Sequence, residues 1–207
     1  MGRERRITPE QRFYTGRLHE SKWLGEVDAG DAMVREMQQY KKPSKNPKFE
    51  FWINFDDSLK LVKKFQPIDK TDPEKKRVDA ANPEAPLLRD VKEALIDQMN
   101  LTDKQADNLK LYTAVGSPMD VFHGADAIIE YDGKVVTIDL TLKPVDEGKK
   151  ADVVVAGDLP APDDPETEDA YLQRVDDIAA SVKTILKVAE KRGPRPIQRL
   201  YPPSEAA

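Results

Sequence analysis

The chain contains no cysteine and only two histidines among its 207 residues. Disulfide bonds and thiolate metal sites are therefore excluded, and a zinc site built on histidine is not expected. Any catalytic or metal-binding chemistry must come from carboxylates, lysines and hydroxyl groups.

Long apolar runs are also absent. No segment approaches the roughly 20 residues that a membrane-spanning helix needs, and the start MGRERRITPEQ lacks the apolar core of a signal peptide. We therefore expect no membrane partner and a cytoplasmic location. The net charge of -5 argues against a protein that coats nucleic acid, but basic segments such as KKPSKNPK allow a local phosphate-binding surface.

Composition and pattern predict a compact core with polar extensions, because 34% of the residues are charged and 16 are proline. Residues 1–82 are predicted to be mostly helical, with a linker at 41–48, one strand at 48–55 and a proline-rich linker from 66 to 86. Residues 83–207 are predicted to form an α/β domain around a small mixed sheet.

The most informative segment is GADAIIEYDGKVVTIDLTLK, which spans residues 124–143. Asp132-Gly133 between two β-branched runs is the strongest short-range signal for a two-residue hairpin turn, here joining strands at 121–131 and 134–143. Counting back from the turn sets Asp126 opposite Asp139. The two carboxylates then share one face, while the other face is almost unbroken apolar surface.

Like charges directly opposite each other across an antiparallel pair destabilise a hairpin unless something compensates them. A hard divalent cation is one such partner, so Asp126 and Asp139 predict a site for Mg²⁺ or Mn²⁺. The alternative is structural: Asp126 caps the strand entry, and Asp139 pairs with a lysine such as Lys143.

Three further polar residues have a structural interpretation that we favour. Glu130 is expected to be a solvated charge at a strand end, Glu93 a solvated helix position, and His123 a buried histidine with its hydrogen bonds satisfied.

Residues 165–192 carry apolar side chains at alternating spacings of four and three, which predicts a long helix with one packing stripe. This stripe is interpreted as core. The alternative is a homodimer seam, because the spacing is nearly that of a heptad.

The order helix, antiparallel hairpin with an aspartate on each strand, further strand, long helix and short strand resembles the αβββαβ core of the PD-(D/E)XK nuclease superfamily, over about residues 87–201. In that restriction-endonuclease-like family, an aspartate and an acidic-x-lysine triplet bind magnesium and activate water for phosphodiester hydrolysis. The resemblance implies that Asp126 is the first aspartate, with Asp120 a weaker candidate. Asp139-Leu140-Thr141 would be the triplet, and the Leu140 carbonyl would complete the metal coordination.

The chain departs from this pattern at Thr141, which stands where the family has its lysine. A threonine can position water but supplies no positive charge. Lys143, on the same face, could replace that lysine, or Lys183 or Lys187 on the long helix could supply it.

The resemblance implies a magnesium-dependent nuclease acting on DNA, or a degenerate derivative, with catalytic residues Asp126, Asp139, Thr141 and Lys143. The alternative is a non-catalytic nucleic-acid-binding or virion-type interaction protein that uses the same core as a scaffold.

Overall fold

The computed structural model describes residues 18–69, 72, 74, 76–142, 150–162, 164–188 and 198–200. Its centre is a five-stranded sheet with the strand order β3-β4-β5-β6-β7. β4 is antiparallel to both of its neighbours, β3 and β5, whereas β6 and β7 run parallel to β5. The predicted mixed α/β class is therefore confirmed. The strands are β3 (Lys110–Thr113), β4 (Ala127–Tyr131), β5 (Lys134–Thr141), β6 (Val153–Ala156) and β7 (Gln198–Leu200).

The hairpin of β4 and β5 has the predicted register. Tyr131 pairs with Lys134 at the turn, and Ala127 pairs with Ile138 at the far end. The two turn residues, 132 and 133, have φ angles of 51° and 72°. Positive φ at both positions is what a two-residue type I′ turn requires, and Asp-Gly tolerates it.

The strand expected from residue 121 is replaced by a short helix, α6 (Pro118–His123), so β4 begins only at Ala127. The side chain of Ser117 accepts a hydrogen bond from the Met119 amide, and Pro118 occupies the first turn. Gly124 ends the helix with φ at 63°, a left-handed conformation that favours glycine. These capping signals outweigh the apolar alternation that suggested a strand.

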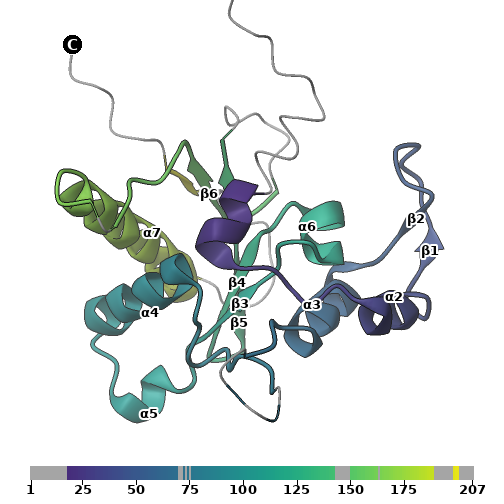
Figure 1. Cartoon of the computed structure of the whole chain (residues 1–207), viewed down its shortest axis with the longest axis horizontal. Coiled ribbons are helices and arrows are strands. Elements are labelled where there is room, and N and C mark those ends of the chain that lie inside the picture. The colour runs from purple at the N-terminus through teal and green to yellow at the C-terminus, as the bar shows by residue number, and fades with distance from the viewer. Residues whose placement is uncertain are drawn as a thin grey trace, which may run out of the picture.

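One face of the sheet is covered by two long helices, α4 (Pro86–Met99) and α7 (Glu168–Val188), which pack against each other (Figure 1). The predicted apolar face of the hairpin contributes Ile129, Val136, Ile138 and Leu140 to this core. The described part of the α7 stripe is buried there too, so the core interpretation is confirmed and these side chains are not available as a dimer seam. They are Tyr171, Val175, Ile178, Val182 and Ile185.

The opposite face carries α3 (Phe55–Lys64) and α6, which bury Leu59, Val62 and Met119 against Ile128. The N-terminal helix, residues 18–24, is drawn in purple in Figure 1. It is attached to the main core by Trp23, whose ring stacks on that of Tyr171 with centroids 5.7 Å apart.

Residues 41–52, partly expected to be a linker, form a small antiparallel ladder of β1 (Lys42–Pro43) and β2 (Phe51–Trp52). The strand predicted at 48–55 is shorter because Asn54 caps α3, its side chain accepting the Asp57 amide at 2.9 Å. The remaining short helices are α2 (Asp31–Met37) and α5 (Asp103–Ala106). None of the helices in the described ranges is long and apolar enough to cross a membrane.

Candidate functional site

Asp126 lies immediately before β4, held between two strands. Its amide donates to the Ile138 carbonyl at 2.7 Å, and its carbonyl accepts from the Ala114 amide at 2.7 Å. The side chain is only 3% exposed, and its Oδ2 accepts a hydrogen bond from the Leu140 amide at 2.8 Å. Backbone and side chain are therefore both fixed relative to β5.

Asp139 lies on β5, directly after Ile138, which pairs with the first residue of β4, Ala127. Its side chain is 5% exposed. Alternation along the strand places it on the same face as Thr137 and Thr141, away from the α4 and α7 core. The structure thus brings the two predicted carboxylates together at one end of the hairpin.

The pKa of Asp126 is raised well above its ordinary value. Burial is the largest cause, followed by the negative charges of Glu20, Asp120 and Asp139, whereas the hydrogen bond from the Leu140 amide acts in the opposite direction. A carboxylate in such surroundings stays ionised only if a cation compensates the charge.

Two of the residues that act on Asp126 come from helices. Asp120 is on α6, where its Oδ2 accepts the Gly116 amide at 2.9 Å. Glu20 is on the N-terminal helix, and nothing in the sequence singles it out, because its position depends on how that helix packs on the core. The acidic character of the site therefore extends beyond the hairpin.

The backbone of Leu140 supports its predicted role. Its amide points to Asp126, whereas the carbonyl of the next residue, Thr141, accepts the Gly157 amide at 2.9 Å on the β6 side. The amide and carbonyl of one strand residue point the same way, and successive residues alternate. The Leu140 carbonyl is therefore directed to the side where Asp126 lies.

Within the described ranges, no three or more histidine, cysteine, aspartate or glutamate side chains converge closely enough to hold a metal ion. Asp126 and Asp139 offer carboxylate oxygens at this end of the hairpin, and the Leu140 amide donates to Asp126. Magnesium is commonly held by one or two carboxylates, with water and substrate phosphate completing its shell. The residues present fit that cation.

Thr141 stands where the PD-(D/E)XK pattern has its lysine. Thr141 is 5% exposed on the carboxylate face, and Lys143 lies outside the described residues. The suggestion that α7 supplies a lysine is wrong for Lys183, whose Nζ donates to the Gln98 carbonyl at 2.6 Å. Lys187 is exposed on the same helix, which covers the opposite face of the sheet.

Glu130 differs from the expected solvated charge. Lys63 of α3 forms an ion pair with it at 2.7 Å, and the Tyr112 hydroxyl lies 3.3 Å from its Oε2. This carboxylate is therefore compensated within the fold. Glu93 is exposed on α4, as expected.

His123 is a structural residue, as expected. Its Nε2 lies 3.0 Å from the Ile53 carbonyl, and its ring packs against those of Trp52 and Phe55. Burial is the main cause that lowers its pKa. The packed imidazole at this position connects α6 to β2 and α3.

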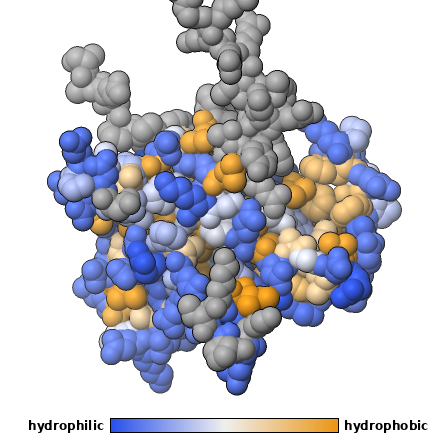
Figure 2. Space-filling model, in the orientation of Figure 1, coloured by the Kyte–Doolittle hydropathy of each residue, from blue (hydrophilic) through white to orange (hydrophobic). Residues whose placement is uncertain are grey.

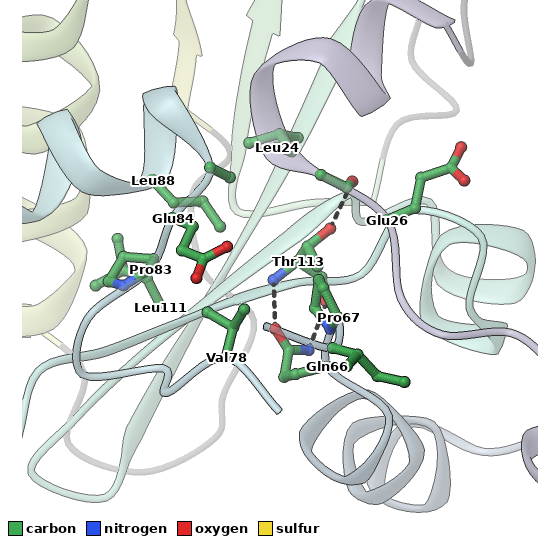
Figure 3. A pocket seen from close by; sticks show the side chains of 13 residues that line it. Leu24, Glu26, Gln66, Pro67, Val78, Pro83, Glu84, Leu88, Leu111 and Thr113 are labelled. Carbon is green, nitrogen blue, oxygen red and sulfur yellow. Dashed lines mark hydrogen bonds between the residues drawn. The ribbon is translucent and has the colours of Figure 1, made fainter. Parts of the chain in front are cut away.

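A cavity of about 410 Å³ lies elsewhere, beside β3 (Figure 3). Most of its wall is apolar. The amide side chain of Gln66 exchanges hydrogen bonds with the Thr113 backbone, and the Thr113 hydroxyl donates to the Gly25 carbonyl at 2.9 Å. Neither of the paired aspartates lines this cavity, so it is separate from the carboxylate site.

Comparisons of the chain with models of protein families, with curated proteins and with solved structures found no match. The functional argument therefore rests on the carboxylate pair and its surroundings.

Proposed function

We propose that this chain is a magnesium-dependent nuclease that hydrolyses phosphodiester bonds of DNA, or a degenerate derivative of such an enzyme. The observation that carries the proposal is that two buried aspartates, Asp126 and Asp139, come together at the end of the hairpin, where the amide of Leu140, the residue after Asp139, donates a hydrogen bond to Asp126. The negative charges of Glu20, Asp120 and Asp139 all raise the pKa of the buried Asp126, and a divalent cation bound beside it would favour the ionised carboxylate.

Each residue has a defined part in the proposal. Asp126 and Asp139 hold the ion, with the Leu140 carbonyl as a third oxygen. The Leu140 amide keeps the Asp126 carboxylate oriented toward β5. Thr141 positions water or a phosphate oxygen, and Lys143 is proposed to supply the positive charge. Magnesium in this site would acidify water and stabilise the charge that develops on the phosphate.

The arrangement of elements supports the same proposal. The hairpin is followed by β6, then α7, then β7, and α4 precedes it, as in the αβββαβ order of the PD-(D/E)XK superfamily. The chain adds β3 and two short helices, α5 and α6, between α4 and the hairpin. Because α6 carries Asp120, this insertion contributes to the acidic surroundings.

A second candidate function follows from Thr141. Without a cation beside the carboxylates, the same core would act as a non-catalytic scaffold for nucleic acid or for a protein assembly. In that case the aspartates would be a structural remnant of a metal site.

Metal binding and cleavage should be tested separately. Thermal melting in EDTA and in millimolar Mg²⁺ or Mn²⁺ reports binding, with the double variant Asp126→Asn/Asp139→Asn as the control. Cleavage is assayed on supercoiled, linear and single-stranded DNA with the same metals. A metal-dependent rise in melting temperature together with cleavage above the double variant is the expected result. A rise without cleavage favours the scaffold, and no response of either kind contradicts both the metal site and the enzyme.

A further inference from the structure

Residues 41–52 form a distinct projection, here called the basic arm. In its short ladder, Lys42 pairs with Trp52 and Pro43 pairs with Phe51. The arm extends from the side of the molecule next to α2 and α3 (Figure 1). The prolines of KKPSKNPK suggested a linker, but they are part of an antiparallel turn.

The turn of the basic arm is internally ordered. Ser44 and Asn46 exchange hydrogen bonds, the Ser44 hydroxyl donating to the Asn46 carbonyl and accepting from its amide, both at 3.1 Å. The side-chain oxygen of Asn46 accepts a hydrogen bond from the Lys48 amide at 3.0 Å, and the backbone carbonyl of Asn46 accepts one from the Phe49 amide at 3.1 Å. The lysines of the turn are therefore presented from a defined backbone.

The arm is basic in an acidic protein. It holds four lysines and one glutamate, whereas the whole chain has a net charge of -5. Lys42, Lys45 and Lys48 are exposed, and none of the three forms an ion pair within the described part of the chain. Lys42 helps to lower the pKa of Asp57, but that carboxylate is itself paired with Lys60 at 2.8 Å. The positive charge of the arm is thus not cancelled locally.

Aromatic packing fixes the arm to the helix that borders the carboxylate site. The Phe122 ring lies in edge contact with Phe49, Phe51 and Trp52, at centroid distances of 5.2, 5.6 and 6.0 Å. Hydrophobic residues gather on this side of the molecule, with hydrophilic residues around them (Figure 2). The same helix, α6, also carries Asp120, whose charge acts on Asp126. One short helix therefore supports both the arm and the site.

We propose that the basic arm binds the phosphodiester backbone of DNA and holds the substrate next to the Asp126 and Asp139 pair. Lysine ammonium groups on an ordered turn suit regularly spaced phosphates, and such contacts carry no sequence preference. The chain outside the arm carries a net negative charge, so the arm is a local concentration of positive charge in an acidic protein. Delivery to the carboxylates rests on the proposed nuclease function, whereas binding by the arm does not.

The experiment measures fluorescence anisotropy of a short fluorescein-labelled DNA duplex, in EDTA and over a series of salt concentrations. The arm variant is Lys42→Gln/Lys45→Gln/Lys48→Gln. The matched control, with the same loss of charge, is Lys104→Gln/Lys110→Gln/Lys187→Gln. These three lysines are exposed on α5, β3 and α7, and α5 and α7 lie on the other side of the molecule from the arm (Figure 1).

The arm variant should bind about tenfold or more weakly at low salt, and the slope of log K against log salt should fall by roughly 2 to 3, about one per lost phosphate contact. The control variant should bind nearly as the wild type does, and melting temperatures should confirm that both variants are folded. Equal losses in the two variants, an unchanged arm variant, or a wild type that does not bind DNA would each overturn the proposal.

Cleavage separates this proposal from the proposed function. If the wild type cuts DNA, the arm variant should show a raised KM with little change in kcat, because the carboxylates are intact. If the wild type binds DNA through the arm but never cuts it, the nuclease fails and the arm stands. If it cuts DNA equally well without the arm lysines, the arm proposal fails and the nuclease stands.

Discussion

The amide of Leu140 donates a hydrogen bond to Oδ2 of Asp126 over 2.8 Å, between β5 and the residue that precedes β4. This bond ties one carboxylate to the strand that carries the other. Because the amide and carbonyl of one strand residue point the same way, the Leu140 carbonyl is also directed to the side of β5 on which Asp126 lies. Asp126, next to β4, and Asp139, on β5, are thus attached to two paired strands, and a site on strands is held more precisely than a site on loops.

Replacing Asp139 with asparagine should stabilise the metal-free protein, because it removes one of the negative charges that oppose ionisation of the buried Asp126. The expected gain in the free energy of unfolding is roughly 0.5–1 kcal/mol. The same change should abolish metal-dependent stabilisation, which in the wild type should reach about 2.7 kcal/mol at a hundredfold excess of ion over its Kd. Denaturant unfolding with and without Mg²⁺ measures both effects.

Asp132→Asn is the matched control for this variant. It removes the same charge at the exposed hairpin turn, where asparagine tolerates the φ of 51°. Its metal response should equal that of the wild type. An Asp139→Asn protein that still gains stability from magnesium would show that the ion binds elsewhere.

The hairpin was predictable because two independent signals agree. Asp132-Gly133 sets the turn, and the apolar alternation sets which side chains face the core. Glu20 was not predictable, since its helix reaches the site through the stacking of Trp23 on Tyr171, a contact between distant segments. The sequence predicts a linker at 41–48 and a strand at 48–55, but not their pairing, because the ladder is only two residues long and its aromatic residues are held by the distant Phe122.

Phe122→Ala should loosen the basic arm from α6. The phenyl ring is 7% exposed and contacts three arm rings, so truncation should lower the free energy of unfolding by about 3 kcal/mol. Hydrogen exchange should accelerate most at β1 and β2, while the β4 and β5 amides remain more strongly protected. Val121→Ala, at a position that is 53% exposed on the same helix, should change neither quantity appreciably. Unchanged protection of β1 and β2 in Phe122→Ala would contradict the anchoring role.

His123 should make the protein less stable under mildly acidic conditions. Burial lowers its pKa in the folded state, whereas the unfolded chain has a pKa near the ordinary value of about 6.5. Between these two values the unfolded state binds more protons, so stability falls as the pH drops through that window and is fully present above it. His123→Gln keeps an amide donor for the Ile53 carbonyl but does not titrate. The difference in unfolding free energy between wild type and variant should therefore shrink as the pH falls below about 6.5. A difference that does not change with pH would show that the pKa of His123 is not lowered in the folded state.

Lys143→Ala addresses the source of positive charge in the proposed reaction. If Lys143 replaces the family lysine, the variant should lose DNA cleavage by at least about a hundredfold while its melting temperature still rises with magnesium. Lys150→Ala is the matched control, because it removes a lysine seven positions further along the chain. This variant should cleave DNA as the wild type does. Full activity in Lys143→Ala would remove that residue from the proposed mechanism.

Thr141→Lys is the complementary change, because it restores the family triplet. The new ammonium group would lie on the face of Asp139 and near Asp126, where two buried carboxylates favour a cation. In a degenerate nuclease this change should raise cleavage from none to a detectable rate, whereas Thr141→Met, of similar length and without charge, should remain inactive. Plasmid nicking with Mn²⁺ offers a sensitive measurement. Thr141→Lys could bind metal and remain folded, yet be no more active than Thr141→Met. In that case the missing positive charge is not what separates this chain from an active nuclease. The scaffold function would then explain the carboxylate pair better.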